Sequence, residues 1–395
     1  MSEQEKTSGG RTRWGRRILF GIVAFVILLG IGGYIALQFA PVHLVVAQDS
    51  GTIDQVEMPD GFEISIFADN VEGARTLRLG DNGTLFVSSR GAGNIYAIPN
   101  ATSSETAEDI IIVDSDLNSP NGIDLVDGDL YVAEIGQITR YDDIEDNLTS
   151  AESTLITDAL PEVGHHGWRY MGYAPDGMLY VAIGAPCNVC ELEEMFGTIH
   201  RLNLDGTNLE EYVTGVRNSV GFDWHPETGE LWFTNNGRDL MGDDIPPDTL
   251  HYAPEQGLHM GFPYCHAGTI ADPAFGDERS CDEFTPPAQS LTPHGAALGM
   301  RFYTGDSFPE SYQNQIFIAE HGSWNRSVPI GYRVMLATVN DNNEVISYEP
   351  FAEGWLNEET GIAWGRPVDV LVMPDGSLLV SDDAGDKIYR ITYTG

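Results

Sequence analysis

The sequence almost lacks lysine, and positive charge is scarce throughout it. Lys6 and Lys387 are the only lysines among 395 residues, which excludes most mechanisms that depend on a lysine amine. Lysine and arginine together number 20 against 60 aspartates and glutamates, so the formal net charge is −40. Because so acidic a surface repels phosphate backbones, we expect no nucleic-acid partner. The same surface attracts cations and favours solubility.

Long uncharged apolar runs are also missing, with one exception near the N-terminus. Residues 18–40 are uncharged and mostly apolar, and at about 1.5 Å per residue they are long enough to cross a bilayer. Four arginines at residues 11–17 precede this run, and the positive-inside rule keeps them cytoplasmic. A cleaved signal peptide, with VVA at 45–47 as its cleavage site, is the alternative. We predict a cytoplasmic basic tail (1–17), a single-pass transmembrane anchor (18–40), a linker (41–60) and an extracellular or periplasmic domain (61–395).

Only four cysteines occur, and they form two pairs that are close in sequence. Cys187 and Cys190 lie in a CNVC motif, and Cys265 and Cys281 flank a loop rich in Pro, Gly and Asp. In an oxidising compartment we expect disulfides, and of the three possible connectivities we favour 187–190 with 265–281. A c-type haem is not indicated, because Glu191 stands where that motif needs histidine. A zinc site at CNVC would need two further ligands.

A short turn followed by an apolar strand recurs six times along the exported domain. Asp-Gly and Pro-Asp-Gly turns supply the positive φ angles that tight hairpins need. The first four units are about 50 residues apart, which suits a four-stranded blade, and the wider fourth gap predicts an insertion over 256–296. We predict an all-β, six-bladed β-propeller rather than a β-sandwich. The six units are residues 81–87, 127–132, 175–181, 226–233, 314–318 and 374–380.

The two ends of the exported domain carry complementary pieces of one blade. Residues 387–393 form the third strand of the last unit, and the sequence stops at Gly395 before a fourth strand. Residues 62–69 form a strand that has no blade of its own. Pairing these two strands would close the ring and remove both exposed edges.

Polar residues stand just before the innermost strand of each predicted blade, and these strands all begin at one mouth of the central channel. Such a set suits an anion-binding site, because guanidinium groups match carboxylates bidentately. A hydrogen-bonded structural plug is the alternative. The residues are Arg75, Asn121, His165, His166, Arg217, Asn218, His294 and Arg366.

The loops after the second strands open at the same mouth. They bring several carboxylates, which are hard oxygen ligands suited to Ca²⁺. They also bring Trp324, a flat surface for a sugar ring. The carboxylates are Asp239, Asp243, Asp244, Asp382 and Asp383.

Taken together, several motifs resemble the glucose/sorbosone dehydrogenase family, whose members are soluble quinoproteins built on six-bladed propellers. The resemblance covers about residues 55–395 and is closest to the sorbosone dehydrogenase-like branch. The motifs are HHGWR (165–169), YAPDGMLYVAIG (173–184), GVRNSVGFDWHPETGELWF (215–233), GDDIPPD (242–248), IFIAEHGSWNRS (316–327), GYRV (331–334) and GRPVDVLVMPDGSLLVSDD (365–383).

The resemblance implies a role for several of these residues. In the family's HxxxR motif, His165 would be the general base while hydride passes from the sugar to PQQ, and Arg169, the arginine of the motif, would be a cofactor-binding residue. Arg217 and Asn218 look like the pair that contacts PQQ, and Arg366 matches an arginine that binds a PQQ carboxylate. The backbone carbonyls of Gly237 and Arg238 match calcium ligands, with Asp243 and Asp244 as further candidates.

Three positions depart from the family pattern. The family's cofactor-facing lysine aligns near Gly322, and Arg326 in the adjacent SWNRS loop is the expected substitute. A second family arginine is Val368 here, and an acidic residue of the third blade is Ala185.

The resemblance therefore predicts a PQQ- and Ca²⁺-dependent sugar or aldose dehydrogenase that passes electrons to an external quinone or cytochrome. A calcium-dependent lactonase would instead need a metal held by side-chain carboxylates in the channel. A non-catalytic binding propeller displayed on the membrane would keep the blades but would not need the converging His, Arg and Asn residues.

Overall fold

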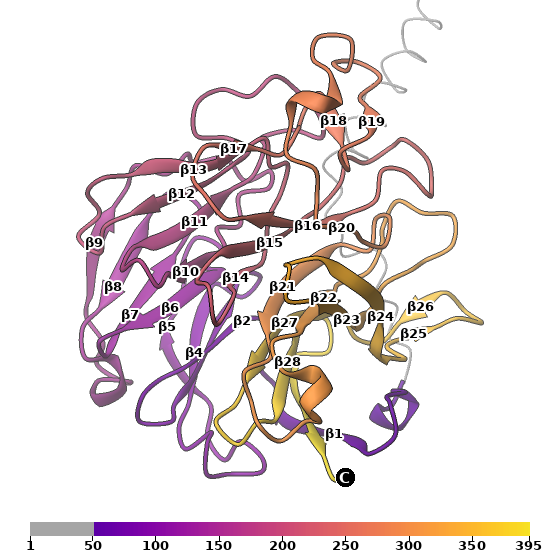
Figure 1. Cartoon of the computed structure of the whole chain (residues 1–395). Helices are drawn as coiled ribbons and strands as arrows, with labels where there is room; N and C mark the ends of the chain where they lie inside the picture. The colour runs from indigo at the N-terminus through magenta and orange to yellow at the C-terminus, as the bar shows by residue number, and fades with distance from the viewer. Residues whose placement is uncertain (1–50) are drawn as a thin grey trace, which may run out of the picture. The chain divides into compact units, whose positions relative to one another are not determined.

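The computed structural model describes residues 51–395, and this part of the chain is built from β-strands (Figure 1). Six sheets of four or more strands follow one another along the chain, so the predicted six-bladed propeller is confirmed. In residues 51–395 no helix is long and apolar enough to cross a membrane. The predicted tail at 1–17 and anchor at 18–40 lie outside the described residues.

The strands of each blade follow in chain order, apart from one closing strand and one insertion. The first three blades are β2–β5 (Ala74–Leu79, Leu85–Ser89, Asn94–Ile98, Ile111–Asp114), β6–β9 (Gly122–Val126, Asp129–Ala133, Ile138–Tyr141, Ser153–Thr157) and β10–β13 (Met171–Tyr173, Leu179–Ile183, Thr198–Leu202, Glu210–Thr214) with β17 (Leu258–His259) added. The last three are β14–β16 (Phe222–Trp224, Leu231–Asn235, Thr249–Ala253) with β20 (Gln289–Ser290), β21–β24 (Ala297–Phe302, Ile316–Glu320, Arg333–Val339, Val345–Glu353), and β27–β29 (Pro367–Val372, Leu378–Asp382, Lys387–Tyr393) with β1 (Phe62–Asp69). Two hairpins, β18–β19 (Cys265–His266, Ile270–Ala271) and β25–β26 (Leu356–Asn357, Ile362–Ala363), and short 3-10 helices at Ile53–Gln55, Ile144–Asp146, Cys281–Glu283 and Glu310–Tyr312 complete the described elements.

The ring closes through the predicted strand at its N-terminal end. β1 pairs antiparallel with β29, from Phe62 opposite Tyr393 to Asp69 opposite Lys387. This pairing gives the sixth blade its fourth strand and leaves β29 without a free edge.

The turns that define the repeat adopt the conformations that their sequences require. In the third blade, Gly177 has φ +85°, which is costly for residues with a side chain. The carboxylate of Asp176 accepts the amide of Met178 at 3.1 Å and so fixes the turn before β11. Asp375 and Ser377 repeat this arrangement in the sixth blade, at 3.0 Å.

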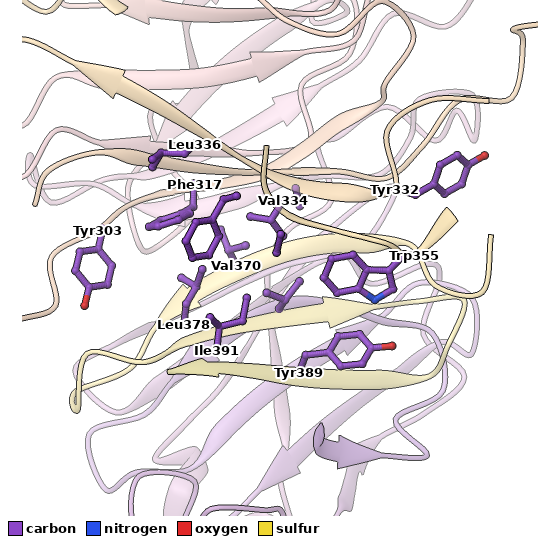
Figure 2. Close-up of a cluster of buried hydrophobic side chains, with 14 of the residues drawn as sticks. Tyr303, Phe317, Tyr332, Val334, Leu336, Trp355, Val370, Leu378, Tyr389 and Ile391 are labelled. Carbon is purple, nitrogen blue, oxygen red and sulfur yellow. The ribbon is translucent and has the colours of Figure 1, made fainter. Parts of the chain in front are cut away.

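Neighbouring blades pack through apolar faces. Figure 2 shows the largest such cluster, between the fifth and sixth blades, where Phe317 and Val334 face Val370 and Leu378. Trp355 is fully buried at one end of this cluster, against the ring of Tyr389. Alternation along each strand sends one set of side chains into each of the two flanking interfaces.

The inner strands of all six blades meet around the axis, where they supply a buried polar layer. Arg78 on β2 and Arg301 on β21 lie 3.7 and 3.8 Å from the Asp369 carboxylate on β27. Arg78 also pairs with Asp124 on β6 at 3.0 Å, and Arg301 donates to the hydroxyl of Tyr170 at 2.7 Å. A structural plug was the alternative explanation for polar residues in the channel, and such a plug exists here. It lies further along the inner strands than the residues predicted to form the site.

The predicted insertion separates β16 from β20 and is held by a covalent crosslink. Both predicted disulfides form, joining Cys187 to Cys190 and Cys265 to Cys281. The second disulfide connects β18 to the start of a 3-10 helix, so it clamps the insertion onto itself. Within the insertion, Asp272 is buried and binds both His266 and the guanidinium of Arg238.

Candidate active site at the channel mouth

The residues that precede the inner strands converge as predicted. Arg75, just inside β2, donates from Nε to Asn121 Oδ1 at 2.9 Å, which links the first two blades. Its Nη1 binds Asp383, in the loop after β28, also at 2.9 Å. Both Arg75 and Asn121 are almost fully buried. Blades one, two and six therefore meet in a single polar cluster.

Arg366 extends this cluster toward the fifth blade. Its guanidinium donates to the carbonyls of His321 and Gly322, both at 2.9 Å. His321 in turn lies 2.7 Å from Asp383 through Nε2, and burial beside Arg366 lowers the pKa of His321 to about 4. His321 is therefore neutral near pH 7. The other carboxylate of this loop, Asp382, is buried and accepts the backbone amides of Arg366 and Gly385, so it is not exposed to a ligand.

Arg217 and Asn218 form the fourth blade's side of the mouth. Arg217 binds Asp239 at 2.7 Å and donates to the carbonyl of Asn188, next to the Cys187–Cys190 disulfide, at 2.9 Å. The Asn218 amide nitrogen donates to the side chain of Asn236, at 3.4 Å. The short disulfide loop is therefore part of the framework that holds Arg217.

His165 and His166 occupy different environments. His165 is exposed at the mouth, and the partial burial of its ring together with nearby Arg217 lowers its pKa. The ring of His166 turns inward, with Nδ1 2.8 Å from the carbonyl of Ala185. Burial lowers the pKa of His166 well below its ordinary value. Both rings are thus favoured in the neutral form, and His165 is the one that solvent or a ligand can reach.

Arg169, four residues after His165, does not face the mouth. It is 1% exposed, and it donates to the carbonyls of Ile135 at 2.9 Å and Pro161 at 2.6 Å. Burial lowers its pKa to about 10, so it keeps its charge near neutral pH. Arg169, at one end of the loop that carries His165, thereby binds Pro161 at the other end and also Ile135 of the second blade.

The SWNRS loop is tied to the loop that follows β15. Arg326 donates to the backbone carbonyl of Asp243 and lies 3.4 Å from the carboxylate of Asp244. The amide of Ser327 contacts the Asp243 carboxylate at 3.2 Å. Trp324, in the SWNRS loop, is 53% exposed. Arg326, Asp243 and Asp244 therefore contact one another rather than the Arg75 cluster.

The loop after β15 also carries the predicted calcium ligands. The amide of Gly237 donates to Asp248 at 2.8 Å, and burial raises the pKa of Asp248 to about 7. The carbonyls of Gly237 and Arg238 accept no hydrogen bond from residues 51–395. Over the same residues, no three His, Cys, Asp or Glu side chains gather as metal ligands. The described structure therefore provides backbone oxygens at this loop but no carboxylate cage.

Sequence reasoning missed two residues of the mouth, Arg90 and Trp168. Arg90 follows β3, and its guanidinium carbon lies 3.8 Å from the centre of the Trp168 ring. Trp168 lies inside the HHGWR motif, and the loops after second strands had already been predicted to open here. Applying that rule to the first blade would have identified Arg90.

Comparisons with known proteins agree with this architecture. The sequence matches the TrAA12-like family over residues 56–394. An uncharacterized protein of Borreliella burgdorferi is 33% identical over 352 residues, which cover 86% of this chain and 91% of that protein. A pyrroloquinoline quinone-dependent pyranose dehydrogenase of Coprinopsis cinerea is 25% identical over 277 residues, 60% of this chain but only 33% of its own length.

Solved structures show the same fold. The holo form of the pyranose dehydrogenase PQQ domain from Coprinopsis cinerea matches with a TM-score of 0.73 at 18% identity, covering 88% of this chain and 98% of that chain. The calcium structure of a Trichoderma reesei carbohydrate-active enzyme of family AA12 matches at 0.74 and 18%, covering 86% and 97%. The sequence match over nearly the whole described domain, together with this shared fold, shows that the chain belongs to the TrAA12-like family, among the soluble PQQ sugar dehydrogenase-like proteins that its motifs resemble.

Proposed function

We propose that the chain is a PQQ- and Ca²⁺-dependent dehydrogenase that oxidises a sugar at the channel mouth. The observation that carries this proposal is the gathering of arginines at one mouth of a chain whose net charge is −40. Relatives named as PQQ-dependent pyranose dehydrogenase and as the PQQ domain of that enzyme support it.

The residues at the mouth suit an acceptor-rich cofactor. Arg217, Asn218 and Arg366 would bind the carboxylates of PQQ, because guanidinium and amide donors in a largely buried setting match anionic oxygens. The carbonyl oxygens of Gly237 and Arg238, which are free of hydrogen bonds within residues 51–395, would bind Ca²⁺.

His165 is the proposed general base. Its ring is exposed and its pKa is lowered, so it can accept the proton of a sugar hydroxyl near neutral pH. When bound, PQQ would supply a quinone able to accept the hydride from the carbon that bears this hydroxyl, so that the sugar would lose two electrons and two hydrogens in all. An external quinone or cytochrome would then remove the electrons.

The remaining predicted residues would hold the loops of the site in position rather than bind the cofactor. Arg169 would hold the loop of His165 through the carbonyls of Ile135 and Pro161. Arg326, with Asp243 and Asp244, would hold the loop of Trp324 against the calcium loop. These are positioning roles.

The proposed location is outside the cytoplasm, with the propeller attached to the membrane through residues 18–40. The two disulfides support an oxidising compartment. A fusion of a periplasmic or extracellular reporter to Gly395 should be active, and activity of only a cytoplasmic reporter would contradict the location.

The function can be tested by reconstitution. The purified chain should bind PQQ only with Ca²⁺ present, acquire quinone absorbance, and then reduce an artificial electron acceptor when a sugar is added. Failure to bind PQQ would contradict the proposal. Hydrolysis of lactones with Ca²⁺ alone would favour a lactonase instead.

A further inference from the structure

Arg90, at the mouth, has neither an anionic partner nor a hydrogen-bond acceptor among the described residues. Within residues 51–395 Arg90 makes no hydrogen bond and no ion pair, and its guanidinium lies over the face of Trp168. Burial beside Arg75 and Arg366 lowers its pKa to about 9, so it is still protonated near pH 7. Arg169 and Arg366 also lack a paired carboxylate, but each donates to two backbone carbonyls, whereas Arg90 has no acceptor within residues 51–395.

Two neighbouring donors are also unsatisfied. Arg75 Nη2 and Asn121 Nδ2 are buried and have no hydrogen-bond partner among the described residues. Arg75 and Asn121 are only 2% and 1% exposed, so bulk water does not supply the missing hydrogen bonds. Arg75 also lies over Trp168, with its guanidinium carbon 5.9 Å from the ring centre. Arg75 and Arg90 therefore both lie over one tryptophan, and Arg75 and its partner Asn121 offer buried donors that need an acceptor.

The local charges leave this group positive. Asp383 is the one carboxylate that acts on Arg90, and it already binds Arg75 and His321. Burial would raise the pKa of Asp383, but His321, Arg75 and Arg366 hold it well below its usual range. Asp383 is therefore ionised near pH 7. Three guanidinium groups, those of Arg75, Arg90 and Arg366, lie near this carboxylate. Asp382 also acts on Arg366, but burial raises the pKa of Asp382, so positive charge exceeds negative charge here. The site lacks negative charge, and an anionic oxygen group would supply it.

The position of Trp168 connects this group to the proposed chemistry. Trp168 lies three residues after His165 on the same loop, whereas the proposed cofactor contacts come from the fourth and sixth blades. Resting on the proposed function, we propose that Arg75, Asn121, Arg90 and Trp168 form the substrate subsite, and that they bind the carboxylate of a sugar acid. The ring of Trp168 would stack against the sugar or support Arg90, and the guanidinium forks would bind the carboxylate.

Direct binding tests this assignment without turnover. Calorimetry on the protein reconstituted with PQQ and Ca²⁺ should show glucuronate binding at least tenfold more tightly than glucose. Arg90→Gln should remove most of this preference, a loss of about ten- to hundredfold for glucuronate and a clearly smaller change for glucose. Arg90→Lys should retain part of it, because the charge remains without the planar fork. Arg140→Gln is the matched control, since Arg140 is a partly exposed arginine paired with Asp142 at 2.6 Å on the second blade.

Three results would overturn the proposal. The first is equal affinity of the wild-type protein for glucuronate and glucose. The second is a loss of PQQ binding in Arg90→Gln with the sugar preference intact, which would assign the group to the cofactor. The third is an unchanged glucuronate affinity in the Arg90→Gln variant, when this variant has the same melting temperature as the wild-type protein. A protein that prefers glucuronate yet oxidises no sugar would keep the carboxylate site and contradict the dehydrogenase.

Discussion

His165 and His166 have ring centroids 4.2 Å apart, yet the ring of His166 turns inward to the carbonyl of Ala185, whereas His165, which contacts the backbone of Cys187, is exposed. His166 has φ +48°, a left-handed conformation that turns adjacent side chains in different directions. One ring therefore supports the loop while its neighbour faces the mouth.

This difference predicts the effect of removing each ring. His165→Ala should keep PQQ binding but lower turnover with an artificial acceptor by about 10²–10⁴, the usual contribution of a general base. His166→Ala should lose much less turnover and should chiefly lower thermal stability. If the His166→Ala enzyme is inactive and the His165→Ala enzyme is active, the assignment of the general base to His165 is wrong.

The pH dependence should report the surroundings of His165. Burial and Arg217 lower its pKa, whereas Asp239 raises it. The base form is therefore present below the ordinary histidine pKa, and the acid limb of kcat/KM should lie below about pH 6.5. Asp239→Asn removes the opposing charge and should move that limb to still lower pH. NMR titration of His165 in the two proteins should show the same direction, and a shift to higher pH would contradict it.

Arg217 should matter most for cofactor binding. Removing one partner of a buried charge pair costs about 2–5 kcal/mol, so Arg217→Ala should weaken PQQ reconstitution by at least about thirtyfold. Arg201→Ala is the control, because Arg201 binds Asp176 and Glu210 on the outer part of the third blade. An unchanged PQQ titration in Arg217→Ala would refute the placement.

The polar layer along the axis should dominate stability. Arg301→Met removes one of the two guanidinium groups beside Asp369 and the stronger of the two that act on Asp223, and only Arg78 then remains. It should lower the free energy of unfolding by up to about 3–5 kcal/mol. Denaturant unfolding measures this loss, and adding Asp369→Asn should recover part of it. Arg279→Met is the control, because its exposed pair with Glu283 should contribute less than about 1 kcal/mol. Equal losses in the two variants would show that the layer is not a stabilising network.

The sequence predicted the parts of the fold that depend on local patterns. In the predicted units 81–87, 175–181 and 226–233, the apolar residues after the turn begin β3, β11 and β15 at Leu85, Leu179 and Leu231, because turn residues and alternation determine where strands begin. Both disulfides and the β1–β29 pairing also followed from spacing and from the need to cover edges.

Side-chain direction in the loops was less predictable. Arg75, Arg217 and Arg366 were expected at the mouth and lie there, because strand ends fix their positions. Arg169 was expected near the cofactor, but its guanidinium contacts the carbonyls of Ile135 and Pro161. Arg90 was overlooked because its importance depends on Trp168, which another blade supplies. Such contacts between distant loops leave no periodic signal in the sequence.

The pairing of β1 with β29 joins the earliest and latest strands of the propeller. During synthesis, the segment Phe62–Asp69 emerges first but has no partner until Lys387–Tyr393 has been made. Five blades can assemble progressively while this strand waits, since each is formed from neighbouring segments. Completion of the ring is therefore a late event that depends on the whole chain having been translated, and until then β1 is an unpaired strand that a chaperone or a second nascent chain could bind.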